Sequence, residues 1–167
     1  MIRRHVLSIL VQNNAGVLSR IVGLFSRRGY NIDSLTVGKT EDENISRITI
    51  SLFNNDEMVE QIINQVAKLI EVIKIVEFDP SNTVYREMVM IKIGANQKNR
   101  AEIIEIANIF RARVVDVSIE TLIIEVTGDE DKTIALINML NEYGVKEVIR
   151  TGISALERGK SELKNYK

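Results

Sequence analysis

The chain has 167 residues, of which 45% are hydrophobic and 27% charged, with a formal net charge of −1. This length allows one domain or two small ones, and the mixed charges argue against a nucleic-acid or membrane partner. The sequence contains no cysteine, which excludes disulfides and cysteine-ligated metals. The N-terminus is too polar for a secretory signal, and no apolar run approaches the roughly 20 residues of a membrane helix. We therefore expect a cytoplasmic protein.

The stretch from Asn13 to Val37 predicts a polar turn, a helix and a strand. Helical spacing from about residue 15 to 28 is carried by Val17, Leu18, Ile21, Leu24 and Phe25. Gly29 follows where a left-handed helix cap is needed. Asn13 and Asn14 precede the helix, beside its unpaired N–H groups, and such a helix start can hold a small anion such as a carboxylate.

The first half of the chain follows the order strand, helix, strand, strand, helix, strand. Strands are predicted at 5–11, 31–37, 45–53 and 72–78, and helices at 15–28 and after 54–56. The second helix carries an apolar stripe formed by Val59, Ile62, Ile63, Val66, Leu69 and Ile70. The polar connector 39–44 is interpreted as a mobile loop.

The same order returns after Pro80. Strands are predicted at 84–93, 113–118, 122–127 and from 145 toward 156, with helices at 99–110 and 131–143. The pattern predicts an α+β chain of two consecutive ferredoxin-like βαββαβ sandwiches. We place the domains at 1–79 and 84–167, joined by a linker at 80–83. A unit this small leaves one sheet face bare and one strand edge open, so we expect a homodimer.

Residues for catalysis are scarce. His5, the single histidine, is interpreted as an ordinary residue near the terminus, and Ser19, Ser26 and Ser34 have no acid–base partner in the sequence. The acidic run 41–43 lacks the ligand spacing of a calcium loop and is interpreted as a solvated loop. We find no phosphate-binding or dinucleotide-binding glycine motif, and the strands lack the stacking aromatic residues of RNA-binding βαββαβ modules. We expect no catalytic residue and no metal site.

Asn13, Gly16 and Asn31 allow two interpretations. They can be ordinary turn and cap residues, or they can line a ligand pocket at the helix start. The second interpretation assumes that the strands ending at Asn13 and beginning at Asn31 are neighbours in the sheet.

The run Asn13-x-x-Gly16-Val17-Leu18, followed by the segment 23–37, resembles an ACT domain. More narrowly, the chain resembles the small regulatory subunits of acetohydroxyacid synthase (acetolactate synthase) over residues 3–159. Further matching segments are Ser46-Arg47-Ile48-Thr49-Ile50, Arg86-Glu87, Phe110-Arg111, Val115-Asp116-Val117 and the closing 150–159.

This resemblance implies a non-catalytic subunit that activates a large catalytic subunit and confers feedback inhibition. It implies no cofactor in this chain, whereas the catalytic subunit would carry thiamine diphosphate, Mg²⁺ and FAD. It also implies pairing of two ACT domains, with valine, leucine or isoleucine bound between them. By position, the effector-binding residues would be Asn13, Ala15, Gly16, Val17, Leu18, Asn31 and Ile32. Asn31 and Ile32 would reach the effector across the dimer.

Physical chemistry is compatible with these roles. The helix-start N–H groups suit a carboxylate, asparagine oxygens suit an ammonium group, and Val17 or Ile32 can pack an aliphatic side chain. Two alternatives stay open: a free-standing amino-acid sensor acting on another enzyme or a transcription factor, and a small ferredoxin-like enzyme, which the missing acid–base groups oppose.

Overall fold

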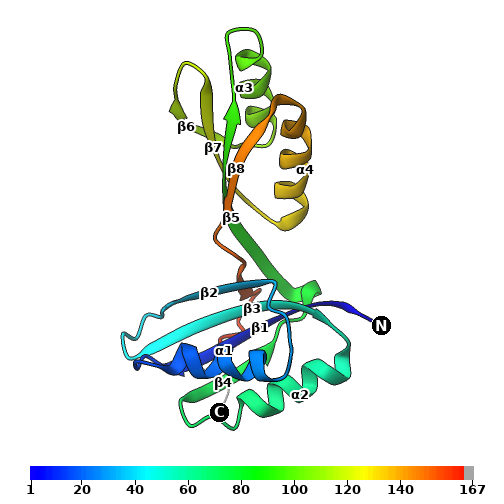
Figure 1. Cartoon of the computed structure of the whole chain (residues 1–167). Helices are drawn as coiled ribbons and strands as arrows, with labels where there is room; N and C mark the ends of the chain where they lie inside the picture. The colour runs from blue at the N-terminus through cyan, green and yellow to red at the C-terminus, as the bar shows by residue number, and fades with distance from the viewer. Residues whose placement is uncertain (164–167) are drawn as a thin grey trace. The chain divides into compact units, whose positions relative to one another are not determined.

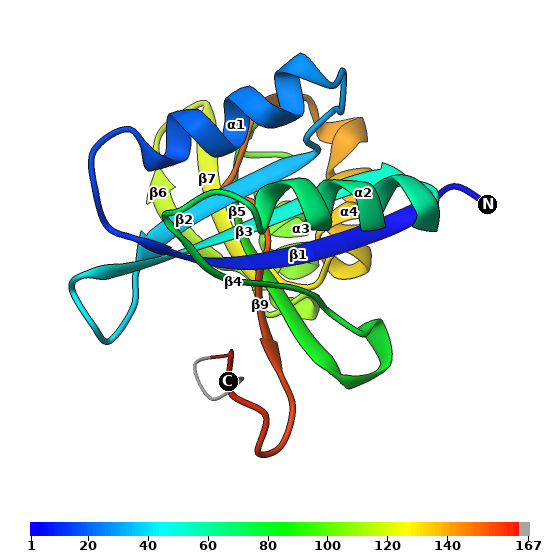
Figure 2. The ribbon, with the colours of Figure 1, turned by 90° about the horizontal axis from the view of Figure 1, so that it is seen from below.

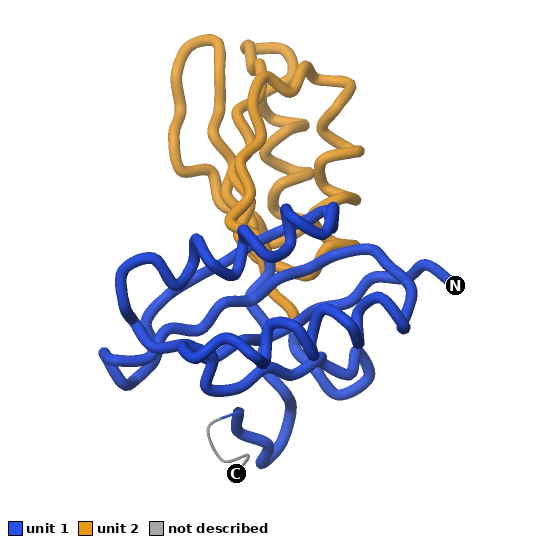
Figure 3. Tube along the Cα trace, turned by 60° about the horizontal axis from the view of Figure 1, so that its bottom comes forward, with its two compact units in different colours: residues 1–84, 153–167 blue, residues 85–152 orange. Residues whose placement is uncertain are grey.

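The computed structural model describes residues 1–163, which divide into two compact units (Figures 1 and 3). The first unit contains residues 1–84 together with the segment from 153 onward, and the second contains residues 85–152. The elements of the first βαββαβ repeat are β1 (Arg3–Gln12), α1 (Val17–Arg27), β2 (Ser34–Lys39), β3 (Ile45–Asn54), α2 (Asp56–Val66) and β4 (Val72–Glu77).

The first sheet has the strand order β2-β3-β1-β4, and all of its pairs are antiparallel. Both helices lie on one face of the sheet (Figure 2). The predicted βαββαβ order is confirmed, but the expectation that the first two strands are neighbours is wrong, because β3 lies between β1 and β2. The physical reason is that a crossover through α1 carries the chain past one strand position, into which β3 then inserts.

Alternation along the strands builds the first core. Leu7, Ile9 and Val11 of β1 face α1 and α2 together with apolar residues of β3, whereas the intervening residues face away. Helix α1 contributes Ile21 and Phe25, which are 0% and 1% exposed. The core is therefore assembled from the two periodicities seen in the sequence.

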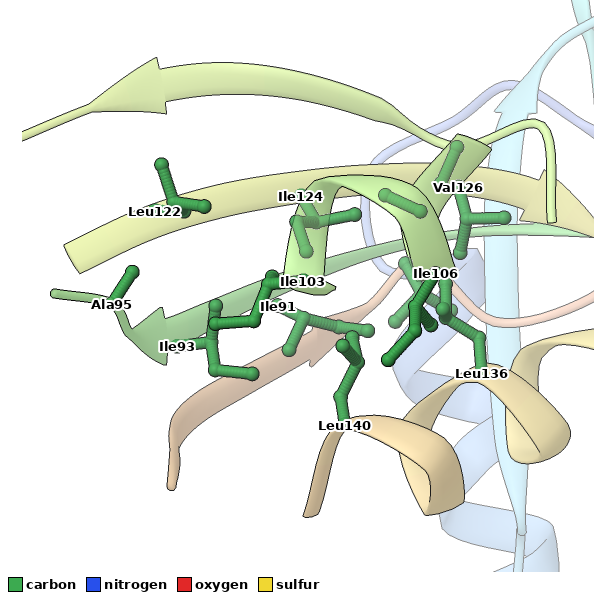
Figure 4. Close-up of a cluster of buried hydrophobic side chains, with 13 residues drawn as sticks. Ile91, Ile93, Ala95, Ile103, Ile106, Leu122, Ile124, Val126, Leu136 and Leu140 are labelled. Carbon is green, nitrogen blue, oxygen red and sulfur yellow. The ribbon is translucent and has the colours of Figure 1, made fainter. Parts of the chain in front are cut away.

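The second unit repeats this arrangement. Its elements are β5 (Thr83–Gly94), α3 (Arg100–Ile109), β6 (Arg113–Val117), β7 (Thr121–Gly128), α4 (Glu130–Leu140) and β8 (Val145–Arg150). The sheet order is β6-β7-β5-β8. Figure 4 shows its core, in which Ile103 and Ile106 of α3 and Leu136 and Leu140 of α4 gather against branched side chains of β5 and β7.

The C-terminal segment 153–163 returns to the first unit. It contains the short strand β9 (Ser154–Glu157), which pairs with β5. The Thr36 hydroxyl donates to the Ile153 carbonyl at 3.1 Å, and the Ile153 N–H donates to the Ser34 hydroxyl at 3.4 Å. Ile153 and Leu163 are 5% and 6% exposed. The sheet face opposite α1 and α2, which we expected to be bare, therefore has contacts with the chain's own C-terminal segment.

Several predicted boundaries require correction. The predicted second domain includes the segment 153–163. In the structure this segment belongs to the first unit, where its apolar residues are buried. The proposed linker 80–83 contains the 3-10 turn η1 (Pro80–Asn82), and β5 begins at Thr83. The last strand stops at Arg150 before β9 begins.

The helices are also shorter than their apolar patterns suggest. Helix α2 ends at Val66, and Ile70 at the end of the predicted stripe is 90% exposed. Helix α4 ends at Leu140 and continues as the 3-10 turn η2 (Asn141–Tyr143). Apolar spacing marks a face and does not fix where a helix ends.

Candidate functional site

The start of α1 is the candidate binding site. Helix α1 begins at Val17 rather than Ala15, and Gly16 occupies the N-cap position with φ 85°. No side chain caps this helix end, so the interpretation of Asn13 as its cap residue is wrong. A left-handed N-cap favours glycine, and a Cβ added at Gly16 would meet no atom within 4 Å.

The first-turn N–H groups are placed to receive an anion. The Val17 N–H reaches the Asn14 carbonyl at 3.4 Å, and the Arg20 N–H donates to the Gly16 carbonyl at 3.1 Å. Within residues 1–163, no backbone acceptor pairs with the N–H groups of Leu18 and Ser19. These groups and the open space at Gly16 form a small polar surface at the positive end of the helix.

Asn13 connects this helix start to the β2–β3 hairpin. Its Nδ2 donates to the Glu43 carbonyl at 2.9 Å, and its Oδ1 accepts from the Ser46 hydroxyl at 3.1 Å. Its backbone N–H donates to the Asn44 carbonyl at 2.8 Å. Each side-chain atom retains capacity for one further hydrogen bond. Asn13 therefore holds the hairpin in place and can still contact a ligand.

Asn31 and Ile32 lie at the other end of the same sheet. Gln12 pairs with Ile45 at one end of β3, whereas Ser34, three residues after Asn31, pairs with Ser51 near the other end. The eleven residues of α1 separate these ends by about 16 Å. Within one chain, Asn13 and Asn31 therefore do not line one pocket, contrary to the interpretation based on neighbouring strands.

The other predicted site residues differ in exposure. Ala15 and Asn31 are exposed, Leu18 is 36% exposed, and Ile32 is half-buried against the first core. Val17 is 4% exposed and belongs to the core. Its side chain therefore cannot pack against a ligand as proposed, although its backbone still belongs to the helix start.

His5 is not the ordinary terminal residue that we expected. Its side chain is fully buried, with Nδ1 2.7 Å from Glu77 and Nε2 3.0 Å from the Asn54 carbonyl. Arg3 forms ion pairs with Glu77 and with Asp56 at the start of α2. These contacts tie β1, β4 and α2 together, which is a structural role.

Sequence reasoning did not identify Ser46 as a partner of Asn13. Ser46 is 7% exposed at the start of β3, and its hydroxyl supports the Asn13 carboxamide. A buried hydroxyl at a strand end requires a partner, which is a usable signal once the register is known.

The described part of the chain, residues 1–163, offers neither a metal site nor a membrane-spanning helix. Within these residues, no group of three or more histidine, aspartate or glutamate side chains is arranged so that it could hold a metal ion. Nor does any described helix have the length and apolar character needed to cross a membrane.

Comparison with known families gives a match in each repeat. Residues 7–74 match the family model described as the ACT domain of AHAS small subunit-like proteins, and residues 86–159 match the model described as the small subunit of acetolactate synthase.

Curated proteins and solved structures give the same result. A probable acetolactate synthase small subunit of Archaeoglobus fulgidus is 53% identical over 93% of this chain and 98% of its own length. The acetolactate synthase small subunit of Mycolicibacterium smegmatis is 50% identical over 93% of this chain and 91% of its own. The crystal structure of the acetolactate synthase small subunit of Thermotoga maritima superposes with a TM-score of 0.88 at 43% identity, covering 95% of this chain and 99% of that one.

Proposed function

Because the chain belongs to the family of acetolactate synthase small subunits, we propose that it activates the catalytic subunit and confers feedback inhibition by a branched-chain amino acid. It would act in the cytoplasm, in branched-chain amino acid biosynthesis. The carbon–carbon bond is formed in the partner, where thiamine diphosphate supplies the electron sink. This chain contributes binding and regulation.

The effector site of this proposal is shared between two copies. Strand β2 is an edge strand, and Val37 on it is 50% exposed. Antiparallel pairing of β2 with the same strand of a second copy would place the start of one strand beside the end of the other. Asn31 and Ile32 of the second copy would then approach the end of the sheet that carries Asn13 and Gly16.

The observation that carries the site is the open, uncapped start of α1 at Gly16. A zwitterionic amino acid presents a carboxylate to the helix N–H groups, and the carboxamides of Asn13 and of the second copy's Asn31 can accept from its ammonium group. Ile32 of the second copy offers apolar contact. Leucine and isoleucine are isomers that are one methylene larger than valine, and a methylene is worth only about 1–3 kcal/mol in an apolar pocket.

The direct test is reconstitution with the catalytic subunit of the same organism. We expect the chain alone to produce no acetolactate, the complex to be more active than the catalytic subunit alone, and valine, leucine or isoleucine to lower that activity. Sedimentation of the chain alone should show a dimer that the effector tightens, because ligand bound between subunits stabilises their association. Unchanged catalytic-subunit activity at saturating chain would refute the proposal.

A further inference from the structure

One polar side chain interrupts the apolar row that β3 turns toward α1 and α2. Residues directly opposite each other on neighbouring strands share a face, and Ser46 lies opposite Val11, a core residue. The other members of this row are each 1% exposed or less and belong to the first core: Ile48, Ile50 and Leu52. Ser46 is 7% exposed. A hydroxyl therefore occupies a core-facing position at the end of β3.

The Ser46 hydroxyl holds one of the two polar atoms of the Asn13 carboxamide. It donates to Oδ1 at 3.1 Å, while Nδ2 donates to the Glu43 carbonyl at 2.9 Å. Because a carbonyl only accepts, Nδ2 must face Glu43, and Oδ1 then faces Ser46. One hydrogen bond would let the carboxamide turn about that bond, whereas bonds at both atoms hold its plane. The orientation of the Asn13 carboxamide therefore depends on Ser46.

The second repeat has apolar residues at both equivalent positions. Ala95 takes the place of Asn13, since the N–H of each donates at 2.8 Å to the carbonyl two positions before Leu122 or Ser46. Ala95 and Leu122 are 3% and 0% exposed and belong to the second core. The same fold thus accepts an apolar pair here. The hydrogen-bonded pair of Asn13 and Ser46 occurs in the repeat that carries the proposed effector site.

The groups that hold the carboxamide are themselves fixed by the fold. Ser46 lies on a strand that is paired on both sides, with β1 and with β2. Next to Glu43 in the hairpin, the Asp42 carboxylate accepts from the backbone N–H and the Nδ2 of Asn44, at 2.9 and 3.1 Å. The carboxamide is therefore oriented before any ligand arrives, which lowers the entropic cost of binding.

We propose that Ser46 is a positioning residue of the effector site and acts through the carboxamide of Asn13. This inference rests on the proposed function, because it requires that the effector meets Asn13. Ser46 is buried and does not touch the ligand. It holds Oδ1 so that the remaining lone pair of this atom is in place for the ammonium group of the amino acid. Without the hydroxyl the site is still present, but binding must first order the carboxamide.

The test is a double-mutant cycle on effector affinity, measured by calorimetry on the full chain. Valine, leucine and isoleucine are titrated into the wild type, and the tightest binder of the three is used for the variants. Ser46→Ala should weaken its binding by about 2- to 10-fold, the effect of one neutral hydrogen bond. In an Asn13→Ala background, Ser46→Ala should have no further effect, because the carboxamide through which it acts is gone.

NMR measures the positioning itself. The order parameter of the Asn13 side-chain amide should fall in Ser46→Ala, since one of the two bonds that hold the carboxamide is lost. Ser46→Thr keeps a hydroxyl and suits a strand, so it should restore both the order parameter and the affinity. A role limited to packing would not be rescued in this way, because the rescue requires the hydrogen bond to Asn13.

Ser8→Ala is the matched control. Ser8 lies on β1 of the same sheet and is 0% exposed, and its hydroxyl has no hydrogen-bond partner among residues 1–163. The substitution removes the same atom from a buried position, so effector affinity and the Asn13 order parameter should stay at their wild-type values. Equal losses in Ser8→Ala and Ser46→Ala would assign the effect to a general disturbance of the sheet and overturn the proposal.

Two further results would overturn the proposal and leave the effector site intact. One is wild-type affinity in Ser46→Ala, and the other is additive effects of Ser46→Ala and Asn13→Ala. If Ser46→Ala fails to fold, Ser46→Cys replaces it, because a thiol has a similar shape and is only a weak donor; wild-type affinity in that variant would also count against Ser46. Failure of the effector site is distinct, since none of the three amino acids would then bind the wild type.

Discussion

The two repeats make the same turn after their first strand with different residues. The Asn13 N–H donates to the Asn44 carbonyl at 2.8 Å, and in the second repeat the Ala95 N–H donates to the Glu120 carbonyl at 2.8 Å. Ala95 is 3% exposed and has no polar side chain. The fold therefore does not require a carboxamide at this turn, so the polar side chain of Asn13 serves a purpose particular to the first unit.

The loops that lead into the next helix differ in the same way. In the second repeat, Asn96 accepts from the N–H groups of Lys98 and Asn99 at 2.8 and 3.2 Å, and Asn99 accepts from the Asn96 N–H at 2.8 Å. These carboxamides close the loop on itself. In the first repeat, Asn13 instead reaches across to the hairpin, and neither α1 nor α3 has a side-chain cap at its start. A single topology thus accommodates a loop bonded to itself in one unit and a loop bonded to the β2–β3 hairpin in the other.

The largest expected effects come from the buried cores. Ile21→Ala in α1 and Ile103→Ala in α3 truncate equally buried side chains, each 0% exposed. Each substitution should lower the free energy of unfolding by about 2–5 kcal/mol. Because the cores are separate clusters, each variant should destabilise its own unit. Urea unfolding monitored by residue-resolved NMR would test this, and equal destabilisation of both units by either variant would show that they unfold as one.

Substitutions at Gly16 and Gly144 distinguish an effect on ligand binding from an effect of backbone strain. Both have positive φ, 85° and 86°, and both have open space where a Cβ would lie. Aspartate at either position should cost about 1–2 kcal/mol of stability. Gly16→Asp should in addition weaken effector binding roughly 100-fold or more, because its carboxylate opposes that of the ligand, and feedback inhibition of the reconstituted enzyme should be lost.

Gly144→Asp is the matched control. It introduces the same charge and similar strain in the second unit, so effector affinity and inhibition should stay at the wild-type level. Equal loss of inhibition in both variants would assign the effect to strain and remove Gly16 from the site.

Alanine substitutions at Asn13 and Asn31 should lower the stability of the fold by different amounts but weaken effector binding to the same extent. Asn13→Ala removes bonds to Glu43 and Ser46 and should cost about 1–2 kcal/mol. Asn31→Ala, at an exposed position, should change stability by less than about 0.5 kcal/mol. Each should weaken effector binding by about 10-fold, the lower end for a hydrogen bond to a charged group.

Thermal unfolding and calorimetric titration of the effector would test both expectations. Unaltered affinity in Asn31→Ala would contradict a site shared across two copies. Unaltered affinity in Asn13→Ala alone would limit that residue to holding the hairpin.

The sequence was sufficient for the order of helices and strands, since the alternation of Ile48 and Ile50 and the helical spacing of Ile21 and Phe25 are local patterns. It could not give the strand order, because the insertion of β3 beside β1 is decided by contacts distant along the chain. Nor could it place Ile153 and Leu163, whose burial depends on a sheet face built more than a hundred residues earlier.

The candidate site was predictable in part. Gly16 stood out because a glycine at a helix start is informative about backbone conformation. The expectation that Asn13 and Asn31 of one chain line the same pocket was wrong because it assumed the wrong strand order.

The smallest expected effect concerns the turn between the repeats. The hydroxyl and N–H of Ser81 donate to Asp79 and lower the pKa of its carboxyl from the ordinary value of 3.8. A carboxyl with a lowered pKa in the folded chain stabilises it above pH 3.8, and that contribution is lost as the pH falls through the folded-state pKa. Ser81→Ala should raise the pKa of Asp79 toward its ordinary value, which NMR titration of the side-chain carboxyl would measure. Because Asp79 is exposed, the stability change should be far smaller than in the core variants. An unshifted pKa would mean that these hydrogen bonds do not persist in solution, and η1 would then be held by Pro80 and backbone bonding alone.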